Sequence, residues 1–237
     1  MELKKKKSTG LLKRIIKIFY KKTEFIYLGE EIEGPSIIIC NHEGSKSPLS
    51  WDLHSGKNVA IWGTYEMNSG LKTNYPYLSK IYFHQKKGWN LFLARLFCII
   101  ASPVTNLIYK RLDVISTYPD ARFKKTIKQS IKYLKEDRNI VIFPEMSETG
   151  YFKKLIGFHE GVVFFLDLLK KRGIDVNVYV SYYNKEKNIC LVDKPEKYSK
   201  ISENYLSRKD LAQKLCDKCN SLGEKSSLIE PTSKKKK

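Results

Sequence analysis

Short apolar runs and amphipathic stripes alternate along this chain. Runs with the length of a buried strand cover residues 36–40, 112–117, 139–143, 176–182 and 189–193. Apolar residues at helical spacing cover residues 123–134, 161–172 and 207–222. Alternation of this kind is typical of an α/β fold. We therefore expect a central mixed or parallel sheet flanked by helices, with its last two strands paired around the turn at Asn184–Lys185.

The pattern indicates a single folded domain. No linker long enough to separate two domains interrupts it, and 237 residues suffice to bury a sizeable core. We expect a basic amphipathic lead-in over residues 1–33, an α/β domain over residues 34–222, and a Lys-rich tail over residues 223–237.

The N-terminal segment has the pattern of a basic amphipathic helix. Leu, Ile and Phe recur at helical spacing over residues 11–19, and Lys13, Arg14, Lys17 and Lys21 lie opposite them. Helices of this kind lie in the interface of anionic membranes. Packing of the helix against its own domain would give the same pattern, so both interpretations remain open.

Residues 89–109 are almost continuously apolar and are flanked by Lys86–Lys87 and Lys110–Arg111. Their length matches a bilayer span. Arg95 lies inside the segment, however, and a central Arg costs roughly 2.5–3.5 kcal/mol on the insertion scale. Since Ser102–Pro103 is expected to break the helix, we predict a buried or half-submerged helical hairpin at a membrane interface rather than a span.

The net charge of +19 makes acidic partners the first expectation. Much of the excess lies at the two ends, because residues 1–22 hold nine Lys or Arg and one Glu, and residues 234–237 are all Lys. Basic ends and fifteen Tyr would suit a nucleic-acid-binding protein. No DNA- or RNA-binding motif is present, so we expect no nucleic acid among the partners and keep this class as a distant alternative.

Five Cys residues, in a chain without a segment typical of a secretory signal, indicate a reducing, cytoplasmic compartment. Cys216 and Cys219 form a CxxC pair within a predicted helix. Because no second pair accompanies it, we expect two thiols on the helix surface and no metal site.

Two polar groups follow predicted strands. His42 comes directly after the apolar run that ends at Cys40 and Asn41, and Glu145 comes after the run that ends at Phe143 and Pro144. The carboxyl ends of strands are where α/β proteins place their chemistry. A His at that position is suited to act as a general base.

These motifs and their order resemble the glycerolipid acyltransferase family, which includes the lysophosphatidic acid acyltransferases. Asn41–His42 is similar to the first family block, NHxxxxD, and Val141–Glu145 is similar to the third, FPEGTRS. Residues 111–117 correspond in position to the second block. Residues 158–163 correspond to the helix start that follows the third block, and residues 178–180 to the fourth block. The resemblance covers about residues 34–193 and indicates a variant branch.

The resemblance implies acyl transfer from acyl-CoA or acyl carrier protein to a hydroxyl of a lyso-glycerolipid or related acceptor, without a further cofactor. His42 would be the general base. Residues of the first and third blocks would bind the acceptor, namely Gly44, Ser45, Ser47, Glu145, Met146 and Ser147.

The chain departs from the family pattern beside the base. Ser47 stands five positions after His42, where the family has Asp. A hydroxyl does not neutralise an imidazolium, so another carboxylate would have to orient His42. Asp52 is the candidate we favour as the second catalytic residue, and Glu43 and Glu66 are the others.

A second departure concerns the acceptor. The family's third-block Arg is replaced by Glu148, and the second block lacks its Arg. Guanidinium groups suit phosphate because they pair with it bidentately. We therefore expect an acceptor other than lysophosphatidic acid, with a neutral or differently placed head group.

Together these features predict a peripheral or monotopic protein of phospholipid biosynthesis on the cytoplasmic face of a membrane. Its expected partners are an anionic membrane surface, the acyl donor and the lipid acceptor. A catalytically weak or inactive lipid-binding pseudoenzyme of the same fold is the principal alternative.

Overall fold

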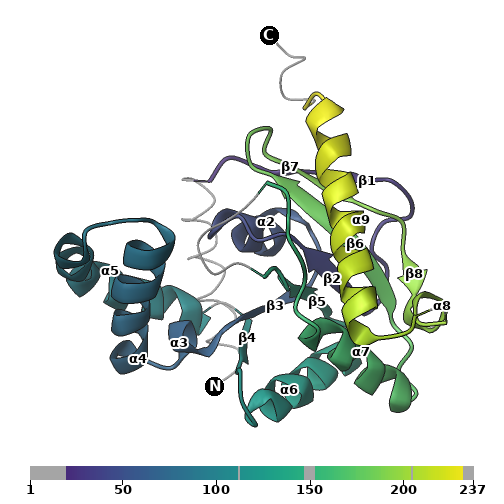
Figure 1. Ribbon diagram of the computed structural model, residues 1–237, viewed down its shortest axis with the longest axis horizontal. Coiled ribbons are helices and arrows are strands. Elements are labelled where there is room, and N and C mark those ends of the chain that lie inside the picture. The colour runs from purple at the N-terminus through teal and green to yellow at the C-terminus, as the bar shows by residue number, and fades with distance from the viewer. Residues whose placement is uncertain (1–19, 112, 147–152, 204, 232–237) are drawn as a thin grey trace.

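The computed structural model describes residues 20–111, 113–146, 153–203 and 205–231, which form an α/β structure around one mixed sheet (Figure 1). The eight strands in this part of the chain are β1 (Glu24–Tyr27), β2 (Ser36–Cys40), β3 (Val59–Thr64), β4 (Val114–Thr117), β5 (Asn139–Ile142), β6 (Asn177–Asn184), β7 (Ile189–Val192) and β8 (Glu196–Lys197). Their order is β1-β7-β6-β2-β5-β3-β4, with β8 beside β6. The predicted α/β class with a mixed, helix-flanked central sheet is confirmed.

The centre of the sheet is parallel. β6, β2, β5, β3 and β4 run in one direction, and β7 is antiparallel to β6 across the predicted turn. Parallel strands that are covered on both faces are apolar at successive positions. The Ile37–Ile39 run is fully buried for this reason.

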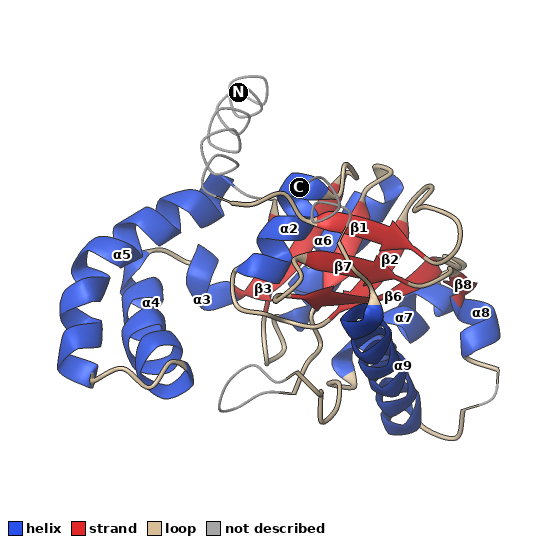
Figure 2. Cartoon of the chain, turned by 90° about the horizontal axis from the view of Figure 1, so that it is seen from above, coloured by secondary structure: helices blue, strands red, loops and turns tan. Residues whose placement is uncertain are grey.

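Helices cover both faces of this sheet, as Figure 2 shows. One face packs against α6 (Phe123–Lys135), α7 (Gly161–Lys171) and α9 (Arg208–Leu228), and the other against α2 (Lys46–His54). Ile37 and Ile39 belong to the first core, whereas Ile38 and Cys40 pack with Trp51 of α2 in the second. The short helix α8 (Tyr198–Ile201) follows β8.

Between β3 and β4 the chain leaves the sheet and forms a helical arm, residues 65–111, which projects to one side in both views (Figure 1). The arm consists of α3 (Tyr65–Asn68), α4 (Leu71–Pro76), the π-helix η1 (Tyr77–Lys86) and α5 (Leu91–Arg111). Gly88 has a φ of +69° in the turn between η1 and α5. The Asn90 side chain accepts hydrogen bonds from the N–H groups of Phe92 (2.9 Å) and Leu93 (3.4 Å).

The predicted break at Ser102–Pro103 is wrong. α5 continues through Pro103 as one helix of 21 residues, and the hairpin in this region is formed by η1 and α5 instead. Gly88 and the Asn90 cap provide the reversal, so no second turn is needed. By length and composition, residues 91–109 form a helix that could cross a membrane. Only 22% of its most apolar part is buried in the protein.

The expectation of two surface thiols on the last helix is also wrong. Cys216 and Cys219 are completely buried, because they lie on the same face of α9 as Leu215 and Leu222, which packs against the sheet. The Cys219 thiol donates a hydrogen bond to the carbonyl of Ser181, at 3.2 Å. α9 extends to Leu228, six residues beyond its predicted end. Most of the predicted N-terminal helix and Lys234–Lys237 lie outside the described residues.

Candidate functional site

His42 and Glu145 lie together at the carboxyl edge of the sheet. β2 and β5 are adjacent and parallel, with Ile39 opposite Ile142, so the segments that follow them emerge side by side. The carboxylate Oε2 of Glu145 accepts a hydrogen bond from the backbone N–H of His42, at 2.9 Å. The structure thus joins two polar groups that are about a hundred residues apart in the sequence.

The segment that carries Glu145 is fixed by backbone pairing. The N–H of His159 donates to the carbonyl of Pro144 at 2.7 Å, and the N–H of Met146 donates to the carbonyl of Gly157 at 3.0 Å. Glu145 itself forms an antiparallel bridge with Phe158 and is 9% exposed. These contacts hold the carboxylate in place through the backbone on both sides of it.

The His42 ring lies partly buried beside Phe143, with the ring centroids 5.2 Å apart and the planes at 76°. Burial and, secondly, the positive charge of Lys86 lower the pKa of His42 from 6.5 to about 4. The imidazole is therefore neutral at neutral pH, which is the state required of a proton acceptor.

Asp52, Gly44 and Ser45 share a cavity wall with His42. Gly44 turns the chain between β2 and α2 with a φ of +60°, a conformation that favours Gly, and Ser45 is the N-cap residue of α2. Asp52 lies two turns along the same helix. A short strand–turn–helix unit therefore supplies four of the predicted site residues.

Ser47 and Met146 take other positions. Ser47 is completely buried and donates to the carbonyl of Asn41 at 2.9 Å, behind the cavity wall. The Asn41 amide exchanges hydrogen bonds with the backbone of Tyr183, at 2.7 and 3.2 Å, and so ties the end of β2 to β6. Met146 is 43% exposed and is not among the described residues that line the cavity. Ser147 lies outside the described residues.

The other candidate carboxylates also differ in position. Glu66 lines the cavity from the arm and accepts a hydrogen bond from the Thr64 hydroxyl. Glu43 forms an ion pair with Lys185 at 3.5 Å and is not among the described lining residues. Of the three carboxylates considered for orienting His42, Asp52 and Glu66 thus face the same cavity as the imidazole.

The cavity has a volume of about 1090 Å³ and extends from the sheet edge to the helical arm. On the arm it is lined by Tyr77, Leu78, Tyr82, Phe83 and Lys86 of η1 and by Thr105, Ile108 and Tyr109 of α5. Burial raises the pKa of Tyr77 and of Tyr109 to about 12, so both keep their phenolic proton at neutral pH. The sequence motifs do not point to this half of the cavity, apart from the candidate carboxylate Glu66 and the basic pair beside the apolar segment.

Arg122 lies at the rim, next to the cavity residues Tyr118 and Asp120. Its guanidinium binds the Asp120 carboxylate through two nitrogens, at 2.7–3.1 Å. It also lies 4.7 Å from the ring centroids of both Tyr65 and Tyr118. Hydrogen bonding to Arg122 lowers the pKa of Asp120 to about 2. The guanidinium is thus already occupied by a carboxylate.

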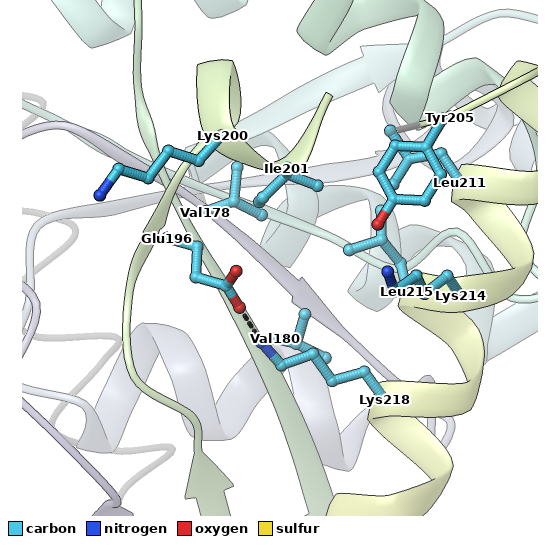
Figure 3. Close-up of a pocket in the computed structure, with 10 residues that line it drawn as sticks. All are labelled: Val178, Val180, Glu196, Lys200, Ile201, Tyr205, Leu211, Lys214, Leu215 and Lys218. Atoms are coloured by element: carbon cyan, nitrogen blue, oxygen red, sulfur yellow. Dashed lines mark hydrogen bonds and ion pairs between the residues drawn. The ribbon is translucent and has the colours of Figure 1, made fainter. Parts of the chain in front are cut away.

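A smaller pocket of about 220 Å³ lies between β6, α8 and α9 (Figure 3). Its floor is apolar, with Val178 and Val180 among its residues. Lys218 at its edge is bound to Asp193, at 3.0 Å, and to Glu196. The pocket contains none of the predicted site residues.

Within the described residues, no group of three or more His, Cys, Asp or Glu side chains is arranged to hold a metal ion. A comparison of the chain with protein-family models finds no match, and a comparison with curated proteins finds none either.

Proposed function

We propose that this protein transfers an acyl group from a thioester donor, acyl-CoA or acyl carrier protein, to a hydroxyl of a lipid acceptor. His42 takes the proton of the acceptor hydroxyl while that oxygen attacks the thioester carbonyl carbon. The tetrahedral intermediate then collapses, the C–S bond breaks, and the departing sulfur takes the proton back from the imidazolium. An ester and a free thiol are the products.

The observation that carries this proposal is that His42, Asp52 and Glu145 line one large cavity. A neutral imidazole, the Asp52 carboxylate and the Glu145 carboxylate all face it, and its far end is formed by the apolar helices of the arm. A volume of about 1090 Å³ accommodates an acyl chain together with a head group. The arrangement also agrees with the order of motifs that resembles the glycerolipid acyltransferases.

Contact with a membrane is part of the same proposal. α5 carries a row of exposed apolar side chains, among them Phe92 (73% exposed) and Ile100 (75%). Soluble monomers rarely expose contiguous apolar patches of this kind. With α5 at the surface of a bilayer, the cavity end lined by Ile108 and Tyr109 would open toward the lipids. We propose a peripheral or monotopic location on the cytoplasmic face.

The low pKa of His42 favours a second candidate, lipid binding without turnover. General-base efficiency falls as the pKa of the base falls below the working pH. A pKa of about 4 makes His42 a weak proton acceptor unless a bound substrate or a reorienting carboxylate raises it. The same cavity would then serve as a lipid-binding site alone.

The test is incubation of the purified full chain with labelled acyl-CoA and a panel of lyso-lipids, followed by lipid extraction. We expect an acylated lipid from the wild type and none from His42→Ala. The matched control is His84→Ala, because His84 is exposed and lies outside the cavity lining. If the wild type and His42→Ala both bind lipid and neither acylates it, the second candidate is established. Equal activity of the wild type and His42→Ala would exclude His42 as the base.

A further inference from the structure

The charged side chains that line the cavity are mostly acidic. Lys86 is the one Lys or Arg among the described residues that line it. Five carboxylate side chains line the same cavity, namely Asp52, Glu66, Asp120, Glu145 and Glu160. They come from five different segments of the chain, so the carboxylates surround the cavity instead of clustering on one element.

Two basic residues close in sequence to the third block and to the lining residue Asp120 bind other carboxylates. Arg122 at the rim binds Asp120, and Lys153 binds Glu186 at 2.6 Å on the surface. Neither side chain is among the described lining residues. Among the described lining residues, a phosphate group would thus meet the Lys86 ammonium, the carboxylates of Asp52, Glu66, Glu145 and Glu160, and the Asp120 carboxylate, whose charge Arg122 offsets.

A phosphate dianion and an ionised carboxylate carry only hydrogen-bond acceptors, so they do not bind one another. Their like charges also repel, and the repulsion is stronger in a partly enclosed site than in water. Sugar and glycerol hydroxyls, in contrast, donate hydrogen bonds to carboxylates and carry no charge. The cavity is therefore suited to hydroxyl groups and unsuited to phosphate.

We infer that the acceptor is a lipid with a neutral, polyhydroxylated head group, such as a monoacyl glycosylglycerol, and not a lysophosphatide. The inference rests on the proposed acyl transfer and assigns its acceptor class. Glu160 sets this preference by charge. It is the N-cap residue of α7, is exposed, lines the cavity and makes no side-chain capping hydrogen bond. Its substitution therefore changes the charge without removing a cap.

The experiment compares a short-chain monoacyl glucosylglycerol with the lysophosphatidic acid of the same acyl chain. Dissociation constants are measured on the full chain without a donor, and kcat/KM values with decanoyl-CoA. We expect the glucosyl lipid to be preferred at least tenfold in both. Glu160→Gln should shrink the preference roughly two- to fivefold, the effect of one charge at an open site. Glu224→Gln, an exposed carboxylate on α9, should leave it unchanged.

A wild-type protein that binds or acylates lysophosphatidic acid preferentially would overturn the inference. So would a binding ratio that responds equally to Glu160→Gln and Glu224→Gln. Preferential binding of the glucosyl lipid without acylation of either lipid would instead uphold the head-group preference and refute the proposed transfer. The two failures are thereby distinguished.

Discussion

The Glu145 carboxylate accepts a hydrogen bond from the backbone N–H of His42, at 2.9 Å, and thereby fixes the loop after β2 against the loop after β5. A buried N–H group that loses its acceptor keeps the full cost of its desolvation, about 1–3 kcal/mol. Glu145 therefore has a structural role at the site in addition to any contact with an acceptor.

We expect Glu145→Ala to lower the free energy of unfolding by about 1–3 kcal/mol, because the His42 N–H then has no acceptor at that position. Glu145→Gln retains a carbonyl oxygen there and should cost less. Urea denaturation of the three proteins measures the difference. Equal stabilities of the wild type and Glu145→Ala would mean that this hydrogen bond does not hold the two loops.

The central strands were predictable because of their burial. β2 and β5 are covered on both faces, so they read as uninterrupted apolar runs, and α6 shows a regular stripe because only one of its faces is buried. β3 was not predicted, since its apolar run is limited to Val59–Trp62 and the strand continues through Gly63 and Thr64. His42 and Glu145 were found because they directly follow strands that could be recognised.

The arm was not predictable in the same way. η1 is a π-helix, and its apolar residues do not repeat with the 3.6-residue period of an α-helix. Lys86 reaches the cavity from that helix, more than forty residues after His42, and no local motif marks it. Pro103 indicated a break that tertiary contacts override, since Ser102 and Asn106 beside it are buried.

The lowered pKa of His42 predicts an unusual pH profile. Acylation that depends on the neutral imidazole should persist below pH 6.5 and decline only near pH 4. Lys86→Met removes the positive charge beside the imidazole, so it should raise the pKa of His42 and move this decline to higher pH. Lys87→Met is the control, because Lys87 is exposed and is not among the described lining residues. NMR titration of His42 reports the same pKa without turnover.

The same pKa also has a consequence for stability. The unfolded His takes up a proton near pH 6.5, whereas the folded one does so only near pH 4. The contribution of His42 to the free energy of unfolding is therefore complete above pH 6.5 and is lost as the pH falls toward 4. His42→Gln should unfold with a weaker pH dependence across this window. An unchanged dependence in that variant would show that His42 titrates normally.

Gly44 predicts a conformational cost at the site. Its φ of +60° is left-handed, and a residue with a side chain pays roughly 1–2 kcal/mol to adopt it. Gly44→Ala should therefore be destabilised by about that amount and should also lose activity, because the turn positions His42 and the start of α2. Gly161→Ala is the control: an added Cβ there meets nothing within 4 Å, and Gly161 begins α7. Its stability should equal or exceed that of the wild type, as measured by thermal unfolding.

The exposed face of α5 predicts how the protein meets a membrane. Phe92 and Ile100 are 73% and 75% exposed, so replacing either by Asp removes little packing within the protein. Each substitution places a charge where the apolar face would enter the bilayer, which costs about 2.5–3.5 kcal/mol for an Asp at the centre of a membrane and less near its surface. We therefore expect Phe92→Asp and Ile100→Asp to bind anionic vesicles at least tenfold more weakly while their melting temperatures stay near that of the wild type.

Leu206→Asp is the matched control for these two variants. Leu206 is fully exposed and belongs to the segment between α8 and α9, two helices that lie away from the arm in Figure 1. Its substitution adds the same charge to the molecule, so it has the same effect on the overall attraction to anionic lipids. In cosedimentation, a smaller fraction of each α5 variant than of Leu206→Asp should therefore bind to the vesicles at every salt concentration. If all three lose binding equally, net charge accounts for the loss and α5 is not the membrane-contacting helix.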